Sequence, residues 1–357
     1  MEKSDKKTNE VRTYDKEFWA YFTVFCVIVF GICWLPYLLT QNSWISIGTN
    51  VPNEIGDAIG GTLGPIVALL ASALTFLAFW VQYKANQQQQ YDLKIERFEN
   101  KFYELLQLHR ANTDEMNIAD RVVGRKCFVQ MFNELRYSFM ITMDQYKASS
   151  EAEKKIYDDA KIDFLRFAYT IFFSGTGINS EKQYVSSFND AERKLYIDCK
   201  SAMVRFQEDY SAAKKKNPDS RYFTFDLPLT QTADERTKVF YYFPFNGHGN
   251  RLGHYYRHLY QTVRYVVEQN DSLLDFEQKY FYIKTLRAQL SNYEQLMLYY
   301  NALAWYKDEW HLFFTDFRLI KNLPLGLADI GTHPEVLFGE DIKRLRTKGI
   351  EMFELHE

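Results

Sequence analysis

Histidines and arginines gather in and just before one predicted helix, the segment 247–266 (GHGNRLGHYYRHLYQTVRYV). An imidazole can take up or release a proton near neutral pH, and a guanidinium can hold a phosphate through paired hydrogen bonds. Arg251 and His258 are therefore a candidate pair for acid–base chemistry beside a phosphate group. In the alternative, these side chains only cap backbone groups or bond to neighbouring helices.

The same region offers a second possibility, a ligand pocket. Four basic side chains could converge on a phosphate or nucleotide, and these are Arg257, His258, Arg264 and Arg287. Tyr255, Tyr256 or Tyr260 would then stack on a base. Against this pocket, Arg287 can pair instead with Glu294, seven positions further along.

A metal site finds little support in the sequence. His254 and His258 lie four positions apart and would share a helical face, as two zinc ligands could. Tyr255 follows His254, so the glutamate of an HExxH motif is missing, and no third ligand lies nearby. The chain also lacks a phosphate-binding loop, a calcium loop and a G-x-S-x-G elbow. We expect no metal and no cofactor, and we assign no catalytic residue with confidence.

Two uncharged apolar runs precede these residues, 18–40 and 60–83. Each is long enough to cross a hydrocarbon core of about 30 Å as a helix. No lysine or arginine lies between Lys16 and Lys84, whereas basic residues flank the gap on both sides. The positive-inside rule then predicts a transmembrane hairpin with both termini in the cytoplasm. A cleaved signal peptide would have a shorter apolar region, and a buried hairpin of a soluble protein fits one such run better than two.

Small side chains recur at every fourth position along the second run. The stripe consists of Gly56, Gly60, Gly64, Ala68 and Ser72. Such a stripe lets another helix approach closely within a bilayer. The partner is either the first run of the same chain or a second copy in a homo-oligomer.

Past the apolar runs the chain is too polar for a multi-span transporter, since the mean hydropathy of the whole sequence is −0.37. A net charge of −3 argues against a nucleic-acid binder that relies on bulk electrostatics. The four cysteines show neither metal spacing nor a disulfide framework. We predict a mainly α fold in four parts: a cytoplasmic tail (1–17), a transmembrane hairpin (18–83), a helical rod (84–118) and a cytoplasmic helical domain (119–357).

The rod is predicted from an apolar seam in a stretch without glycine or proline. The seam follows three- and four-residue steps through Tyr91, Ile95, Phe98, Phe102, Leu105 and His109. Helical patterns return at 125–147, 151–173, 188–215, 251–269, 272–306 and 339–352, while 221–250 predicts a small irregular or β insertion.

Four segments, in this order, resemble the AbiC-like family of phage abortive infection proteins. They are 55–65 (IGDAIGGTLGP), 96–110 (ERFENKFYELLQLHR), 252–261 (LGHYYRHLYQ) and 286–294 (LRAQLSNYE). The resemblance spans most of the chain and is weakest from about 140 to 240. It implies a bacterial inner-membrane protein of antiviral defence, in which an infected cell dies or stops growing before phage are released. It implies no enzymatic mechanism and no catalytic residue.

Three hypotheses follow. In the first, the helical domain senses a phage component or a defence-system partner, and the membrane spans then disrupt the inner membrane. In the second, the protein is a membrane-tethered ribonuclease of the HEPN type, whose loose R-x(4–6)-H spacing Arg251 and His258 would match. In the third, it is an anchored binding module without activity of its own. The expected partners are the lipid bilayer, a further copy of the chain and a phage or defence component, while nucleic acid or a nucleotide stays open.

Overall fold

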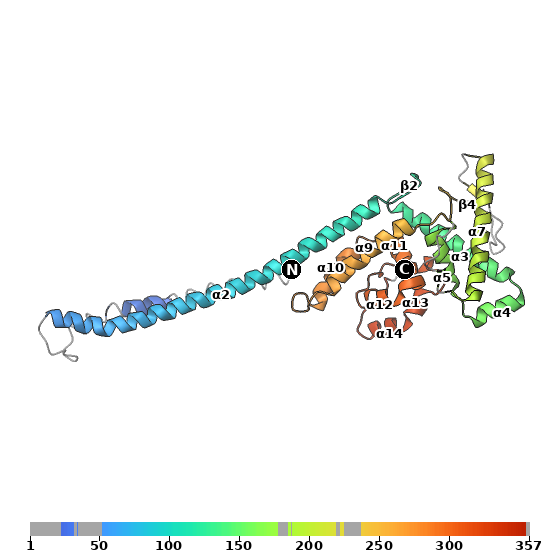
Figure 1. Cartoon of the computed structure of the whole chain (residues 1–357). Coiled ribbons are helices and arrows are strands. Elements are labelled where there is room, and N and C mark those ends of the chain that lie inside the picture. The colour runs from blue at the N-terminus through green and yellow to red at the C-terminus, as the bar shows by residue number, and fades with distance from the viewer. Residues whose placement is uncertain are drawn as a thin grey trace. The chain divides into compact units, whose positions relative to one another are not determined.

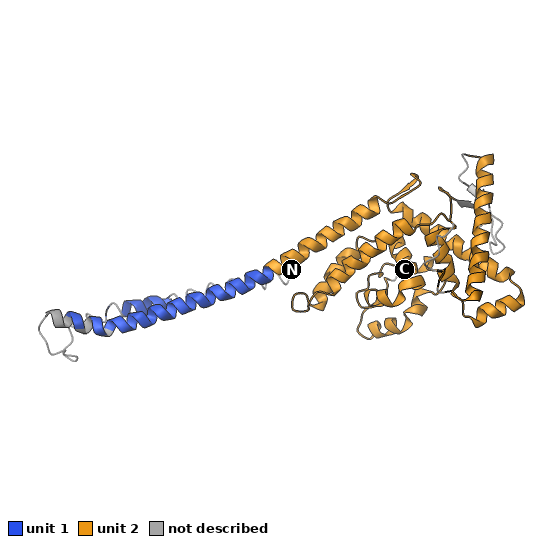
Figure 2. Ribbon diagram, viewed as in Figure 1, with its two compact units in different colours: residues 1–92 blue, residues 93–357 orange. Residues whose placement is uncertain are grey.

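The computed structural model describes residues 23–31, 34, 52–177, 185–186, 188–218, 222–224 and 237–354 (Figure 1). The chain divides into two compact units, Met1–Asp92 and Leu93–Glu357 (Figure 2). The fold is mainly helical, as the sequence predicts.

Helix α2 (Pro52–Asp114) runs without interruption for 63 residues and contains the second apolar run. Over an 18-residue window its mean hydropathy is 2.0, and none of that window is buried. Among the described residues this is the one helix long and apolar enough to cross a membrane. In the first apolar run, residues 23–31 and 34 are helical and the rest lies outside the described residues. A two-helix hairpin is therefore not shown.

The small-residue stripe lies on α2 and is exposed along its length. A Cβ atom added at Gly56, Gly60 or Gly64 would meet nothing within 4 Å among the described residues. The helix partner that the stripe predicts therefore stays a prediction.

Leu93–Glu357 is built from helices around two hydrophobic clusters, with two short antiparallel hairpins. The first half contains β1 (Asn117–Ile118), β2 (Val122–Val123), α3 (Lys126–Ala148), α4 (Glu151–Asp159), α5 (Phe164–Ser174), α7 (Asp190–Lys216), β3 (Tyr222–Thr224) and β4 (Thr237–Val239). The second half contains α9 (Gly249–Val267), α10 (Phe276–Arg287), α11 (Asn292–Asn301), the π-helix η1 (Ala302–Tyr306), α12 (Lys307–Thr315), the 3₁₀ helix η2 (Leu325–Leu327), α13 (Pro334–Leu337) and α14 (Gly339–Arg346).

The C-terminal part of the predicted rod seam packs into the unit Leu93–Glu357. Phe98 and Phe102 are buried, and the ring of Phe98 stacks on Tyr265 of α9 with centroids 5.3 Å apart. Tyr91 is exposed, and Leu106 is buried more fully than the predicted Leu105. The compact helical unit begins at Leu93 and so includes the C-terminal part of α2. The division into a rod (84–118) and a domain (119–357) stays a prediction.

Two predicted helices are each broken in the structure. The segment 272–306 divides at Ala288–Ser291, because Ser291 and Glu294 form a capping box at the start of α11. The Ser291 hydroxyl accepts a hydrogen bond from the Glu294 N–H, and the Glu294 carboxylate accepts one from the Ser291 N–H. The segment 151–173 divides after Asp159, where Lys161 has a φ of +50° and Asp163 caps α5. The hairpin β1–β2 was not predicted, whereas β3 and β4 pair inside the predicted β insertion.

Candidate functional site

The two residues of the candidate acid–base pair lie two turns apart on α9, about 10 Å along its axis. The Nε of Arg251 donates a hydrogen bond to the carbonyl of Asn117, over 2.6 Å. His258 is partly buried and lies against His109 of α2. The two side chains have different neighbours, so this arrangement gives the ribonuclease hypothesis no geometric support.

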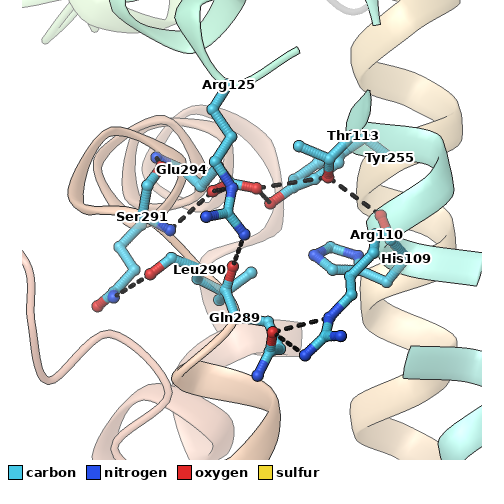
Figure 3. Close-up of polar contacts among 10 residues, drawn as sticks. His109, Arg110, Thr113, Arg125, Tyr255, Gln289, Leu290, Ser291 and Glu294 are labelled. Atoms are coloured by element: carbon cyan, nitrogen blue, oxygen red, sulfur yellow. Dashed lines mark hydrogen bonds and ion pairs between the residues drawn. The ribbon is translucent and has the colours of Figure 1, made fainter. Parts of the chain in front are cut away.

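A polar cluster surrounds Glu294 where α2, α9 and the α10–α11 turn meet (Figure 3). The Glu294 carboxylate is fully buried and accepts hydrogen bonds from the Tyr255 hydroxyl, at 3.1 Å, and from the Ser291 N–H, at 2.7 Å. Arg125 contributes the positive charge, with its Nε 3.6 Å from the carboxylate. Burial, together with this carboxylate, raises the pKa of Tyr255 well above its usual value. These contacts compensate the buried negative charge of Glu294, so the cluster has a structural role.

His109 and His258 lie next to this cluster with their rings nearly parallel, 19° apart, and their centroids at 6.1 Å. All four ring nitrogens are buried without a hydrogen-bond partner among the described residues. Burial, followed by the charges of His258 and Arg125, lowers the pKa of His109 to about 4. Burial also lowers the pKa of His258. Both rings are therefore neutral at pH 7.

The four basic residues of the predicted ligand pocket do not converge. Arg287 is buried and donates a hydrogen bond to the carbonyl of Arg318, at 2.7 Å. Arg264 forms an exposed ion pair with Glu268. Arg257 is exposed, and its Nε donates to the Gly253 carbonyl of its own helix. Of the four, Arg257 alone lines the cavity described next.

The two histidines that were weighed as zinc ligands, His254 and His258, do not face each other with further ligands nearby among the described residues. His254 is exposed, whereas His258 faces His109. No group of three or more His, Cys, Asp or Glu side chains suited to a metal occurs among the described residues.

A cavity of about 590 Å³ lies between α9, the end of α5, η1 and the start of α12. Its aromatic lining consists of Phe173, Tyr256, Tyr260, Trp305, Tyr306 and Trp310. These rings form three edge-to-face contacts, Tyr260 with Trp310 at 5.2 Å, Phe173 with Trp305 at 4.8 Å and Trp305 with Tyr306 at 6.2 Å. Small-molecule sites are commonly of this size and lined by aromatic side chains with a few polar groups.

The polar groups of the cavity are Arg257, Gln261, Asn301 and Glu309. Asn301 is only 2% exposed, and its Nδ2 donates to the Tyr169 hydroxyl at 2.9 Å. Its Oδ1 is buried and has no hydrogen-bond partner among the described residues. Asn301 directly precedes the π-helix η1, and such insertions are frequent at functional sites.

One wall of the cavity depends on a close crossing of two backbones. Gly175 has a φ of +81°, and a Cβ there would lie 2.8 Å from the carbonyl carbon of Asn246. Gly247 has a φ of +86° and approaches Ser174 equally closely. The N–H of His248 donates to the Phe173 carbonyl at 2.9 Å. The crossing thus fixes the start of α9 against the end of α5.

A buried pair that the sequence did not reveal lies beside this crossing. The Glu134 carboxylate on α3 lies 3.0 Å from His248 Nε2 and accepts a 2.8 Å hydrogen bond from the Phe245 N–H. Both side chains are nearly inaccessible to solvent. More than 100 residues separate the partners in the chain, and no local spacing could have indicated the contact.

Comparison with known proteins concerns the same region as the cavity. A family model described as "Putative phage abortive infection protein" matches residues 247–327, from the start of α9 through η2. The match supports the resemblance to the AbiC-like family and contains every cavity residue except Phe173. No curated protein and no solved structure matches the chain. These findings link the chain to phage abortive infection, without a mechanism.

Proposed function

We propose that this protein is a membrane-anchored effector of phage abortive infection. Its helical unit senses a phage component or a defence-system partner, and its membrane segment then disrupts the inner membrane. The observation that carries the proposal is helix α2, which contains both an exposed apolar stretch and a stretch buried in the helical core.

The apolar stretch of α2 requires an apolar environment. Leu69, Phe76 and Phe79 are each about 70% exposed, and their neighbours along the stretch are similarly uncovered. Exposed apolar surface of this length marks a site of interaction. A lipid bilayer satisfies a helix of about 20 uncharged residues without further structure. We therefore assign the stretch to the inner membrane.

The other end of the same helix is held by the sensing unit. Phe102 and His109 are buried against α9 and α10, and Arg110 donates hydrogen bonds to the Gln289 side chain. A rearrangement around Gln289 and Glu294 would act directly on α2. An uninterrupted helix then offers a physical route for the change toward the membrane.

The proposed disruption of the membrane can be tested at the small-residue stripe. We expect Gly64→Leu to abolish growth arrest and loss of membrane potential in cells expressing the protein, because the bulky side chain blocks close helix approach. Ala73→Leu is the control: it adds a leucine to the same exposed helix, nine positions further along and therefore on the face opposite Gly64. Membrane potential is followed with a potential-sensitive dye during phage infection. Arrested cells that keep their membrane potential would contradict the proposal.

A further inference from the structure

We propose that the cavity between α9, η1 and α12 binds a nucleotide. The inference deepens the sensing role proposed above and rests on it for its biological meaning. The binding itself can be measured independently of any effect on membranes.

The aromatic walls fit a planar base. Tyr256 and Tyr260 come from α9, while Trp305 and Trp310 come from η1 and α12. Stacking on such rings contributes about 1–3 kcal/mol for each base. A volume of about 590 Å³ is ample for one nucleotide.

Two charged side chains at the cavity suit the phosphate and the ribose of a nucleotide. The Nε of Arg257 bonds to Gly253, and no hydrogen bond or ion pair occupies its two terminal nitrogens among the described residues. A guanidinium in this state can bind a phosphate through two parallel hydrogen bonds. Glu309 lines the same cavity and forms no ion pair with Arg257. A carboxylate accepts hydrogen bonds from ribose hydroxyls, as in dinucleotide-binding folds.

The test is a titration of the purified full-length protein in lipid nanodiscs. Quenching of tryptophan fluorescence reports on the cavity because Trp305 and Trp310 line it. We expect AMP to bind saturably and adenosine, which lacks the phosphate, to bind at least about tenfold more weakly. ATP, GTP and CMP identify which nucleotide is preferred.

Two substitutions make the result specific to the cavity. Arg257→Gln should remove the preference for AMP over adenosine and leave adenosine binding unchanged. Arg264→Gln, seven positions along the same helix and outside the cavity, should leave both affinities as they are. An equal effect of the two substitutions would overturn the proposal, as would the absence of saturable binding by every nucleotide up to millimolar concentrations.

The two proposals fail in different ways. Nucleotide binding that depends on Arg257, without any effect of Arg257→Gln on growth arrest, would support the site and overturn the sensing role. Growth arrest that depends on Arg257 but leaves the membrane potential intact would support nucleotide sensing and overturn the membrane mechanism.

Discussion

His109 is the residue whose environment has the clearest consequence for stability. Burial of its ring keeps it neutral, with its pKa lowered from 6.5 to about 4. The unfolded chain therefore binds a proton between pH 6.5 and 4 that the folded chain does not. Stability rises with pH across this window and is lost as the pH falls, by about 3 kcal/mol from this residue. His258 shifts in the same direction and adds to the effect.

His109→Phe should flatten this dependence because phenylalanine cannot take up a proton. The free energy of unfolding, from urea titrations at pH 4.5, 5.5 and 7, should then vary less with pH than in the native chain. The matched substitution His254→Phe, at an exposed position on α9, should leave the slope unchanged. An unchanged slope in His109→Phe would show that other groups dominate the pH dependence.

Sequence reasoning at the residue scale named the helix that lines the cavity but not the full set of lining side chains. Arg257, Tyr256 and Tyr260 were all candidates for one pocket, and all three line the cavity. Asn301 and Glu309 were missed, because they come from α11 and α12, which meet α9 only in the folded chain. Nothing in the sequence near Asn301 marks a buried amide with an unpaired oxygen.

At the scale of elements, the crossing of the α5–α7 and β4–α9 connections is the most demanding local feature. Gly175→Ala should destabilise the helical unit by at least about 2–4 kcal/mol, because the new Cβ meets the Asn246 backbone at 2.8 Å with φ at +81°. Thermal unfolding followed by circular dichroism measures the change. Gly177→Ala, two residues away, adds a Cβ that meets nothing within 4 Å among the described residues, and it should shift stability by less than about 0.5 kcal/mol. Equal effects of the two would show that the crossing is not tight.

Elements with strong periodicity were predicted well, and their ends less well. The helices over 125–147, 188–215 and 251–269 are confirmed with small shifts of their ends. The break inside 272–306 has a local signal, the capping box of Ser291 and Glu294. The box lies within a pattern of apolar residues at three- and four-residue steps, which by itself predicts one continuous helix. The pattern consists of Ile283, Leu286, Leu290, Tyr293, Met297 and Tyr300. The π-helix η1 has no such signal, since tertiary packing rather than local propensity determines it.

At the scale of the whole molecule, the continuity of α2 is the feature that the proposed mechanism needs. Gln89 lies on α2 within the exposed run 87–90, between the apolar stretch and the buried stretch. Gln89→Pro removes the hydrogen bond to the Ala85 carbonyl and clashes with the preceding turn, which costs about 3 kcal/mol and kinks or breaks the helix. Both ends keep their own contacts, because no core residue lies in this run.

We expect Gln89→Pro to leave membrane association and nucleotide binding intact while abolishing phage-induced loss of membrane potential. Cell fractionation, the tryptophan titration and the potential-sensitive dye measure these three properties on the same variant. Gln89→Ala keeps the helix and should behave like the native chain. If Gln89→Pro still depolarises infected cells, the signal does not travel through a continuous α2, and the membrane segment responds to the helical unit by another route.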